Sequence, residues 1–106
     1  MKVVNIVERL YRKTPMRQLL FLDPKDNIAV SLVDLKEGQT IVQDGVSIKA
    51  LNHIPRGHKI AVREIKKDSG IIKYGERMGH ATSDISIGEH VHVHNVLGDR
   101  LSTEQK

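Results

Sequence analysis

The apolar residues of this chain form many short runs rich in β-branched side chains, and this constrains the fold more than any other feature. Of the 31 Val, Ile and Leu residues, 22 are Val or Ile, which favour extended backbone. From residue 21 onwards, Gly, Asp, Asn or Pro separates successive runs, as turns separate strands. The pattern predicts an all-β domain with short strands at 27–32, 40–42, 46–50, 59–62, 71–73, 79–82 and 90–95.

An internal repeat indicates that this domain has two related halves. The tripeptide Ile28-Ala29-Val30 recurs 32 residues later as Ile60-Ala61-Val62. A second pattern, apolar-x-x-Gly-x-x-apolar, is typical of a turn that enters a strand, because glycine adopts positive φ at no steric cost. We therefore expect pseudo-symmetric halves rather than a sandwich of long strands. The second pattern occurs at Leu35, Gly38 and Ile41, at Ile54, Gly57 and Ile60, and at Ile85, Gly88 and Val91.

The two ends of the chain differ in character from residues 21–98. Apolar and charged residues alternate over 2–13 with helical spacing, which predicts a short N-terminal helix that ends at Thr14-Pro15. Residues 1–20 form a basic amphipathic leader with five basic side chains and one acidic side chain, so they carry the whole excess charge of +4. This leader could cap the domain, pack on a second copy or contact a partner. Residues 99–106 are expected to form a polar tail.

Composition excludes several classes of protein. The chain has no cysteine, so it has no disulfide and no thiolate metal site. No apolar run approaches the roughly 20 residues that a membrane-spanning helix needs, and charged residues interrupt any secretory signal. Residues 21–106 carry twelve charges of each sign, so nucleic-acid binding is not expected. We expect a cytoplasmic protein, and its modest core makes a homodimer or a partner chain reasonable.

The run 90–95 alternates histidine with valine before it ends in asparagine. In a strand the three imidazoles share one face while the valines face the core. Residues two apart on that face are about 6.5–7 Å apart at the backbone, and two imidazoles at that spacing can converge on one cation. Three in line need a bend to reach the same ion, so two of them with His58 is the favoured geometry. The candidate metal ligands are His90, His92 and His94.

Other interpretations of this histidine run stay open. The alternation can simply place polar side chains on the solvent-exposed face of a strand. The imidazoles can also bind a substrate carboxylate or hydroxyl, or act as general acid or base. His53 and His80 stand alone and are expected to be surface or supporting groups. The sequence has no nucleotide-binding glycine loop, no nucleophile elbow and no His-Glu-x-x-His motif.

Five segments, in this order, carry a resemblance to a known family. They are 23–30 (DPKDNIAV), 54–61 (IPRGHKIA), 72–75 (IKYG), 79–82 (GHAT) and 85–95 (ISIGEHVHVHN). The series resembles the amino-terminal SAF domain of the altronate/galactarate dehydratase family over about residues 21–97. The resemblance implies a β-clip fold, a small all-β unit folded back on itself.

The resemblance also implies an activity and a partner. Members are lyases that act on sugar acids and need a divalent metal, which implies Fe(II) or Mn(II) rather than Zn(II) here. The same domain occurs as a small chain that pairs with a large catalytic subunit, as in two-chain altronate dehydratases and sulfolactate sulfo-lyase. The resemblance further implies that the metal ligands are His90, His92 and His94. The substrate-binding residues that it implies are His58, Lys59, Lys73 and Asn95. A binding module without turnover and a purely structural role are the alternatives.

Overall fold

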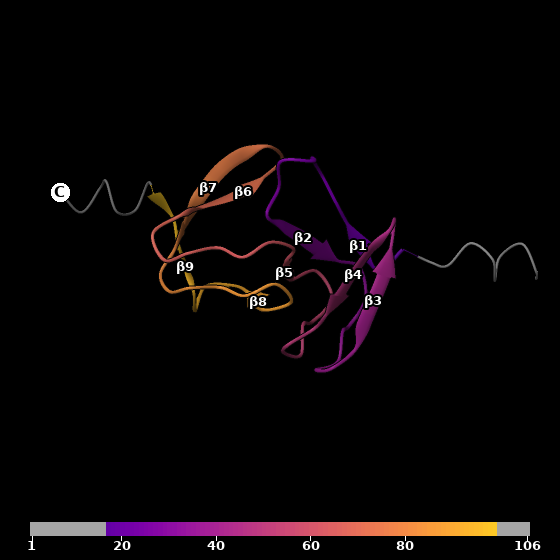
Figure 1. Cartoon of the computed structure of the whole chain (residues 1–106). Coiled ribbons are helices and arrows are strands. Elements are labelled where there is room, and N and C mark those ends of the chain that lie inside the picture. The colour runs from indigo at the N-terminus through magenta and orange to yellow at the C-terminus, as the bar shows by residue number, and fades with distance from the viewer. Residues whose placement is uncertain (1–16, 100–106) are drawn as a thin grey trace, which may run out of the picture.

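The computed structural model describes residues 17–99, and this part of the chain is built from short antiparallel strands joined by turns (Figure 1). None of its segments is a helix long and apolar enough to cross a membrane. The predicted helix at 2–13 and most of the predicted tail lie outside the described residues. The strands are β1 (Leu19–Leu20), β2 (Ile28–Ser31), β3 (Thr40–Gln43), β4 (Val46–Lys49), β5 (Lys59–Ala61), β6 (Gly70–Lys73), β7 (Glu76–Ala81), β8 (His90–Val91) and β9 (Val96–Leu97).

The strands form three small sheets. One has the order β1-β2-β5-β8, the second is the hairpin β3-β4, and the third has the order β6-β7-β9. The all-β prediction is confirmed, and β2 to β8 overlap the seven predicted strands, although β7 begins three residues before the predicted strand 79–82 and β8 ends at Val91. Two strands, β1 and β9, were not predicted, because a two-residue strand is too short to show alternation. β1 pairs with β2, so the first sheet already begins inside the predicted leader.

Two separate apolar cores confirm the pseudo-symmetric halves. Corresponding core residues are 30 or 31 positions apart in the sequence, so each half is built from the same set of side chains. The strands β2 and β5 pair across the boundary between the halves and send alternate residues into the two cores. Leu35, Ile41, Ile54 and Ile60 lie in the first core, and their counterparts Ile65, Ile71, Ile85 and Val91 lie in the second.

The turn pattern that occurs three times in the sequence has a fourth copy in the structure. Leu35 pairs with Ile54 in an isolated bridge, and Ile65 pairs with Ile85 in the same way. The residue three positions after Ile65 is Asp68, which has φ +72° where the other copies have glycine. Aspartate tolerates this left-handed conformation better than most residues. A sequence pattern that requires glycine at this position therefore does not include the fourth copy, which has Asp68 there.

Unlike at Gly38, the surrounding backbone at Gly88 leaves no room for a side chain. Its φ is +91°, and a Cβ built on it would lie 1.9 Å from the carbonyl oxygen of Lys49. Its own N–H donates to the Ala61 carbonyl, and its carbonyl accepts from the Leu51 N–H. Gly88 thus joins backbone from both halves at a point where no side chain fits.

We predict that Gly88→Ala destabilises the domain far more than Gly38→Ala. Gly38 has a similar φ of +87°, but nothing lies within 4 Å of a Cβ there, so its substitution costs about 1–2 kcal/mol of left-handed strain. Gly88→Ala adds a backbone clash and is expected to cost at least about twice as much. Urea unfolding of the two variants measures the difference, and equal losses would contradict this account of Gly88.

Candidate functional site

The pairing of β5 with β8 brings the first two histidines together. In this antiparallel pair Ile60 lies opposite His90, and the two strands run side by side in Figure 1. His58 immediately precedes β5, and its Nδ1 lies 2.9 Å from Nε2 of His90. Residues 32 positions apart in the sequence therefore share one site. Either the two nitrogens share one proton in a hydrogen bond, or both present lone pairs to a cation.

His92 completes a compact group of ring nitrogens. One ligand atom from each of His58, His90 and His92 lies within 4.8 Å of the other two. The ring of His92 stacks on that of His58, with centroids 4.3 Å apart. His94 belongs to the same cluster, because its ring centroid is 5.3 Å from that of His90, but its nitrogens are outside the three-ligand group.

The prediction of a strand over the whole run 90–95 was wrong beyond Val91. The chain leaves β8 there and turns, with the Asn95 N–H donating to the His92 carbonyl at 3.1 Å. Val91 is 1% exposed, as predicted, but Val93 is 82% exposed rather than part of the core. The turn breaks the alternation, and the three-ligand group is formed by His90 and His92 with His58, while His94 stays outside it.

Asn95 is the residue that shapes this turn. It is 2% exposed, its Oδ1 accepts from the His92 N–H at 3.0 Å, and its Nδ2 donates to the His90 carbonyl at 2.9 Å. A second amide, that of Asn52, accepts from the His90 N–H at 2.9 Å. These bonds fix the backbone of two histidines. The predicted contact of Asn95 with substrate stays a prediction.

Electrostatics favour the neutral forms of His90 and His92. Burial, and then the charges of His58 and the other nearby histidines, lower the pKa of His90. Burial, His58 and Lys59 lower the pKa of His92. A neutral ring keeps a lone pair for a metal, and imidazole suits Fe, Zn, Ni and Cu. Because ligand nitrogens lie about 2.0–2.1 Å from an ion such as Zn(II), small ring rotations would bring this group onto one ion. The residues therefore fit a divalent metal.

The two predicted substrate-binding lysines lie in a groove that begins at the histidine cluster. Lys59 from β5 and Lys73 from β6 line an open groove of about 540 Å³ together with His92. Burial, followed by the charge of Lys73, lowers the pKa of Lys59. Among the described residues 17–99, no carboxylate lines the groove, so the described lining is suited to an anion. The other lining residues are Ile28, Ile71, Met78, Val91, Val93, Val96, Leu97 and Gly98.

An ion-pair network lies beside one wall of this groove, and it was not predicted from the sequence. Asp99 follows the wall residues Leu97 and Gly98; its Oδ2 accepts from Arg77 Nε at 2.7 Å, and its Oδ1 lies 2.9 Å from His80 Nδ1. Hydrogen bonds from Arg77 and His80 lower the pKa of Asp99. His80, which was expected to be a surface or supporting group, is paired with a residue 19 positions away.

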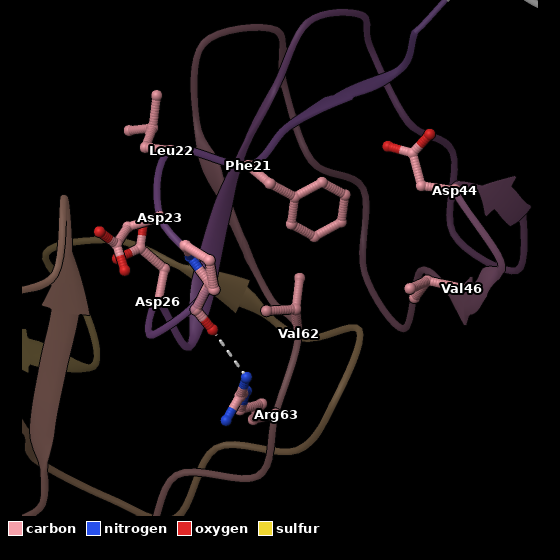
Figure 2. Close-up of a pocket in the computed structure, with 9 residues that line it drawn as sticks. Phe21, Leu22, Asp23, Asp26, Asp44, Val46, Val62 and Arg63 are labelled. Carbon is pink, nitrogen blue, oxygen red and sulfur yellow. Dashed lines mark hydrogen bonds between the residues drawn. The ribbon is translucent and has the colours of Figure 1, made fainter.

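A second hollow, of about 650 Å³, contains none of the predicted site residues (Figure 2). Its apolar wall includes Phe21 and Val62, and Arg63 donates to the Pro24 carbonyl at 2.9 Å. The carboxylate of Asp26 is buried there and accepts from backbone N–H groups of the β6–β7 turn, so its role is structural.

Comparison with known proteins agrees with this architecture. The altronate/galactarate dehydratase SAF domain matches residues 17–99 of the chain. The chain belongs to this family. The match includes β1 and extends to Asp99, and it contains the whole of the predicted domain 21–98.

Two kinds of relative share this SAF domain. The chain is 46% identical over 80 residues to an altronate dehydratase of Bacillus subtilis (strain 168). The aligned residues make up 76% of this chain but only 16% of that protein. It is 37% identical over 85 residues to a (2R)-sulfolactate sulfo-lyase subunit alpha of Chromohalobacter salexigens, covering 74% of this chain and 90% of that protein. The chain thus spans less than a fifth of the altronate dehydratases that it matches.

We predict that the metal-free SAF domain loses stability as the pH falls below about 6.5. Unfolded histidine titrates near pH 6.5, whereas the pKa of His90 is lower in the folded chain, so over that window the unfolded state binds more protons. This contribution is complete above about pH 6.5 and is lost as the pH falls through the folded pKa. Thermal unfolding at pH 7.5 and 5.0 in the presence of a chelator measures it. A His90→Asn/His92→Asn double variant should lose less stability on acidification; an equal loss contradicts the prediction.

Proposed function

We propose that this chain is the SAF module of a metal-dependent lyase for hydroxy acids, which holds a divalent ion in the histidine cluster and a substrate carboxylate in the lysine groove. The observation that carries the proposal is that His92 belongs to both parts of the site. Its ring is in the three-ligand group, and it also lines the groove with Lys59 and Lys73. An ion and an anion would therefore be bound next to each other.

Each residue of the site has a distinct role in this proposal. His58, His90 and His92 hold the metal, with His94 beside them, and the family resemblance favours Fe(II) or Mn(II) over Zn(II). The ion, when bound, supplies Lewis-acid polarisation of the substrate. Lys59 and Lys73 bind and orient the carboxylate through charge-assisted hydrogen bonds. Asn95 maintains the turn that presents His92, which makes it a positioning residue.

The proposed reaction is β-elimination from a sugar acid such as altronate or galactarate. A base removes the proton α to the carboxylate, and hydroxide leaves from the β carbon with a proton to form water. A large catalytic subunit supplies the rest of the active site. The small share of each altronate dehydratase that the SAF domain covers supports this division. So does the word "subunit" in the name of the sulfolactate relative.

A second candidate is the small subunit of a sulfolactate sulfo-lyase, in which sulfite would leave in place of hydroxide. The observation in its favour is that the similarity extends over 90% of a sulfolactate sulfo-lyase subunit alpha. Both candidates use the same metal and carboxylate site. A binding module that holds a metal or a small acid without turnover is the alternative from another class.

We predict that the chain binds one divalent ion and that the histidine cluster provides the ligands. Calorimetric titration with Fe(II) under anaerobic conditions, Mn(II) and Zn(II) should show at least a tenfold loss of affinity in His58→Ala and in His92→Ala, because each removes a direct ligand. His53→Ala is the matched control, since His53 is outside the three-ligand group, and should bind like the parent chain. Equal affinities in all of these proteins would refute the metal site.

We also predict that lyase activity requires a second polypeptide. The purified chain should show no dehydration of altronate or galactarate, whereas its mixture with the matching large subunit should be active. His92→Ala should lower kcat of that mixture at least tenfold while the two chains still co-purify. Full activity of this chain alone, or of the mixture with His92→Ala, would count against the proposed division of labour.

A further inference from the structure

The second hollow is lined by apolar side chains that the described part of the chain leaves partly uncovered (Figure 2). Phe21 and Val62 pack against the first core but are only partly buried, and Val46 on β4 is 41% exposed. The volume of about 650 Å³ is within the range of about 300–1,000 Å³ that is typical of ligand sites. The second hollow can therefore bury a few apolar side chains of another segment.

The charge of the second hollow favours a basic occupant. Its lining has three carboxylates and one guanidinium, that of Arg63, so its formal charge is −2. The carboxylates are those of Asp23, Asp26 and Asp44. In the view of Figure 2, the ring of Phe21 lies between Asp23 on one side and Asp44 on the other. A segment that presents apolar and basic side chains together is complementary to this surface.

The described part of the chain begins at the rim of the second hollow. Arg17, its first residue, donates to Asp44 Oδ2 from Nη1 at 2.7 Å and from Nη2 at 2.8 Å. Gln43 fixes the next turn of backbone, because its Oε1 accepts from the Leu19 N–H at 3.1 Å and its Nε2 donates to the Leu19 carbonyl at 2.7 Å. An exposed ion pair such as Arg17–Asp44 contributes little energy, but it shows where the preceding residues 1–16 are attached.

The sequence that precedes Arg17 has the side chains that this surface favours. Residues 1–16 have four basic side chains and one acidic side chain, so their formal charge is +3. The spacing over 2–13 predicts an amphipathic helix. Its apolar face would consist of Val3, Val4, Val7, Leu10 and Tyr11.

The length of the connection limits where such a helix can lie. The three residues 14–16 span at most about 11 Å when fully extended. A helix over 2–13 would be about 18 Å long. Its carboxyl end is therefore confined to the neighbourhood of Arg17 and Asp44, beside the second hollow.

We propose that residues 2–13 dock as an amphipathic helix in the second hollow of the same chain. Their apolar face covers Phe21, Val46 and Val62, and their basic side chains lie near Asp23 and Asp44. Because the segment is attached beside its site, its effective concentration there is on the order of millimolar, so a small contact is sufficient. Among the described residues, none lines both the second hollow and the lysine groove, so this docking is separate from the proposed metal and substrate site.

A spin label in the full chain tests the docking. The chain has no cysteine, so Asn5→Cys supplies a single attachment site on the polar side of the predicted helix. We expect the amide NMR signals of Phe21, Val46 and Val62 to lose most of their intensity while the label is paramagnetic and to regain it when the label is reduced. Signals of β9, which lies at the opposite end of the described chain from β1 in Figure 1, should keep most of theirs.

A matched pair of valines makes the test specific. Val46 and Val42 belong to the same hairpin and are both exposed, but of the two only Val46 lines the second hollow. Val46→Gln should abolish most of the intensity loss, whereas Val42→Gln should leave it as in the parent chain. Within residues 2–13, Leu10→Gln removes an apolar side chain and should abolish the loss, whereas Glu8→Gln changes the polar face and should not.

A mixing experiment distinguishes the possible occupants. Isotope-labelled chain without the added cysteine is mixed with spin-labelled chain that carries no isotope, so that only contacts between molecules reduce the signals. Docking within one chain predicts no loss in this mixture. A loss there would give the second hollow to a second copy and overturn the proposal. No loss at the second hollow in the single chain, or equal losses in Val46→Gln and Val42→Gln, would overturn it too. Neither metal nor lyase activity enters these measurements, so their outcome is independent of the proposed function.

Discussion

The antiparallel pairing of β5 with β8 is the interaction on which both the fold and the site depend. It places Ile60 opposite His90 and carries His58 to within hydrogen-bond distance of His90. The same pair joins the two cores, because Ile60 is buried in the first and Val91 in the second. A change that shifts this register by one residue would reverse which side chains are buried and would separate the histidines.

The turn that follows Val91 contributes to the histidine site. It holds the backbone of His92, which joins His58 and His90 in the three-ligand group, whereas His94 stays outside that group. The buried amide of Asn95 closes the turn, and with all of its hydrogen-bonding groups engaged it is expensive to replace by an apolar residue. The proposed metal site is thus supported by a polar residue in the interior, and the groove with its two lysines lies beside it.

Much of this architecture was predictable from the sequence because it depends on local patterns. β-branched runs and turn residues predicted the short strands, and the repeat of Ile-Ala-Val predicted the related halves. The resemblance placed His58, Lys59 and Lys73 beside the histidine run. The structure brings His58 together with His90 and His92, and Lys59 and Lys73 together with His92, while the roles of these residues stay predictions. The exposure of Val93 was not predictable, since alternation gives no sign of where a strand ends. The pairing of Asp99 with Arg77 and His80 was missed for a different reason: it depends on β7 lying next to β9, which residue spacing does not reveal.

The most direct test of the central claim is anomalous X-ray diffraction from crystals of the chain grown with Fe(II), Mn(II) or Zn(II). The account predicts a single strong anomalous peak in the histidine cluster, bonded to one nitrogen each of His58, His90 and His92, with the groove of Lys59 and Lys73 open beside it. A peak bonded to His90 and His94 without His58, or no peak in the cluster at all, would contradict the account.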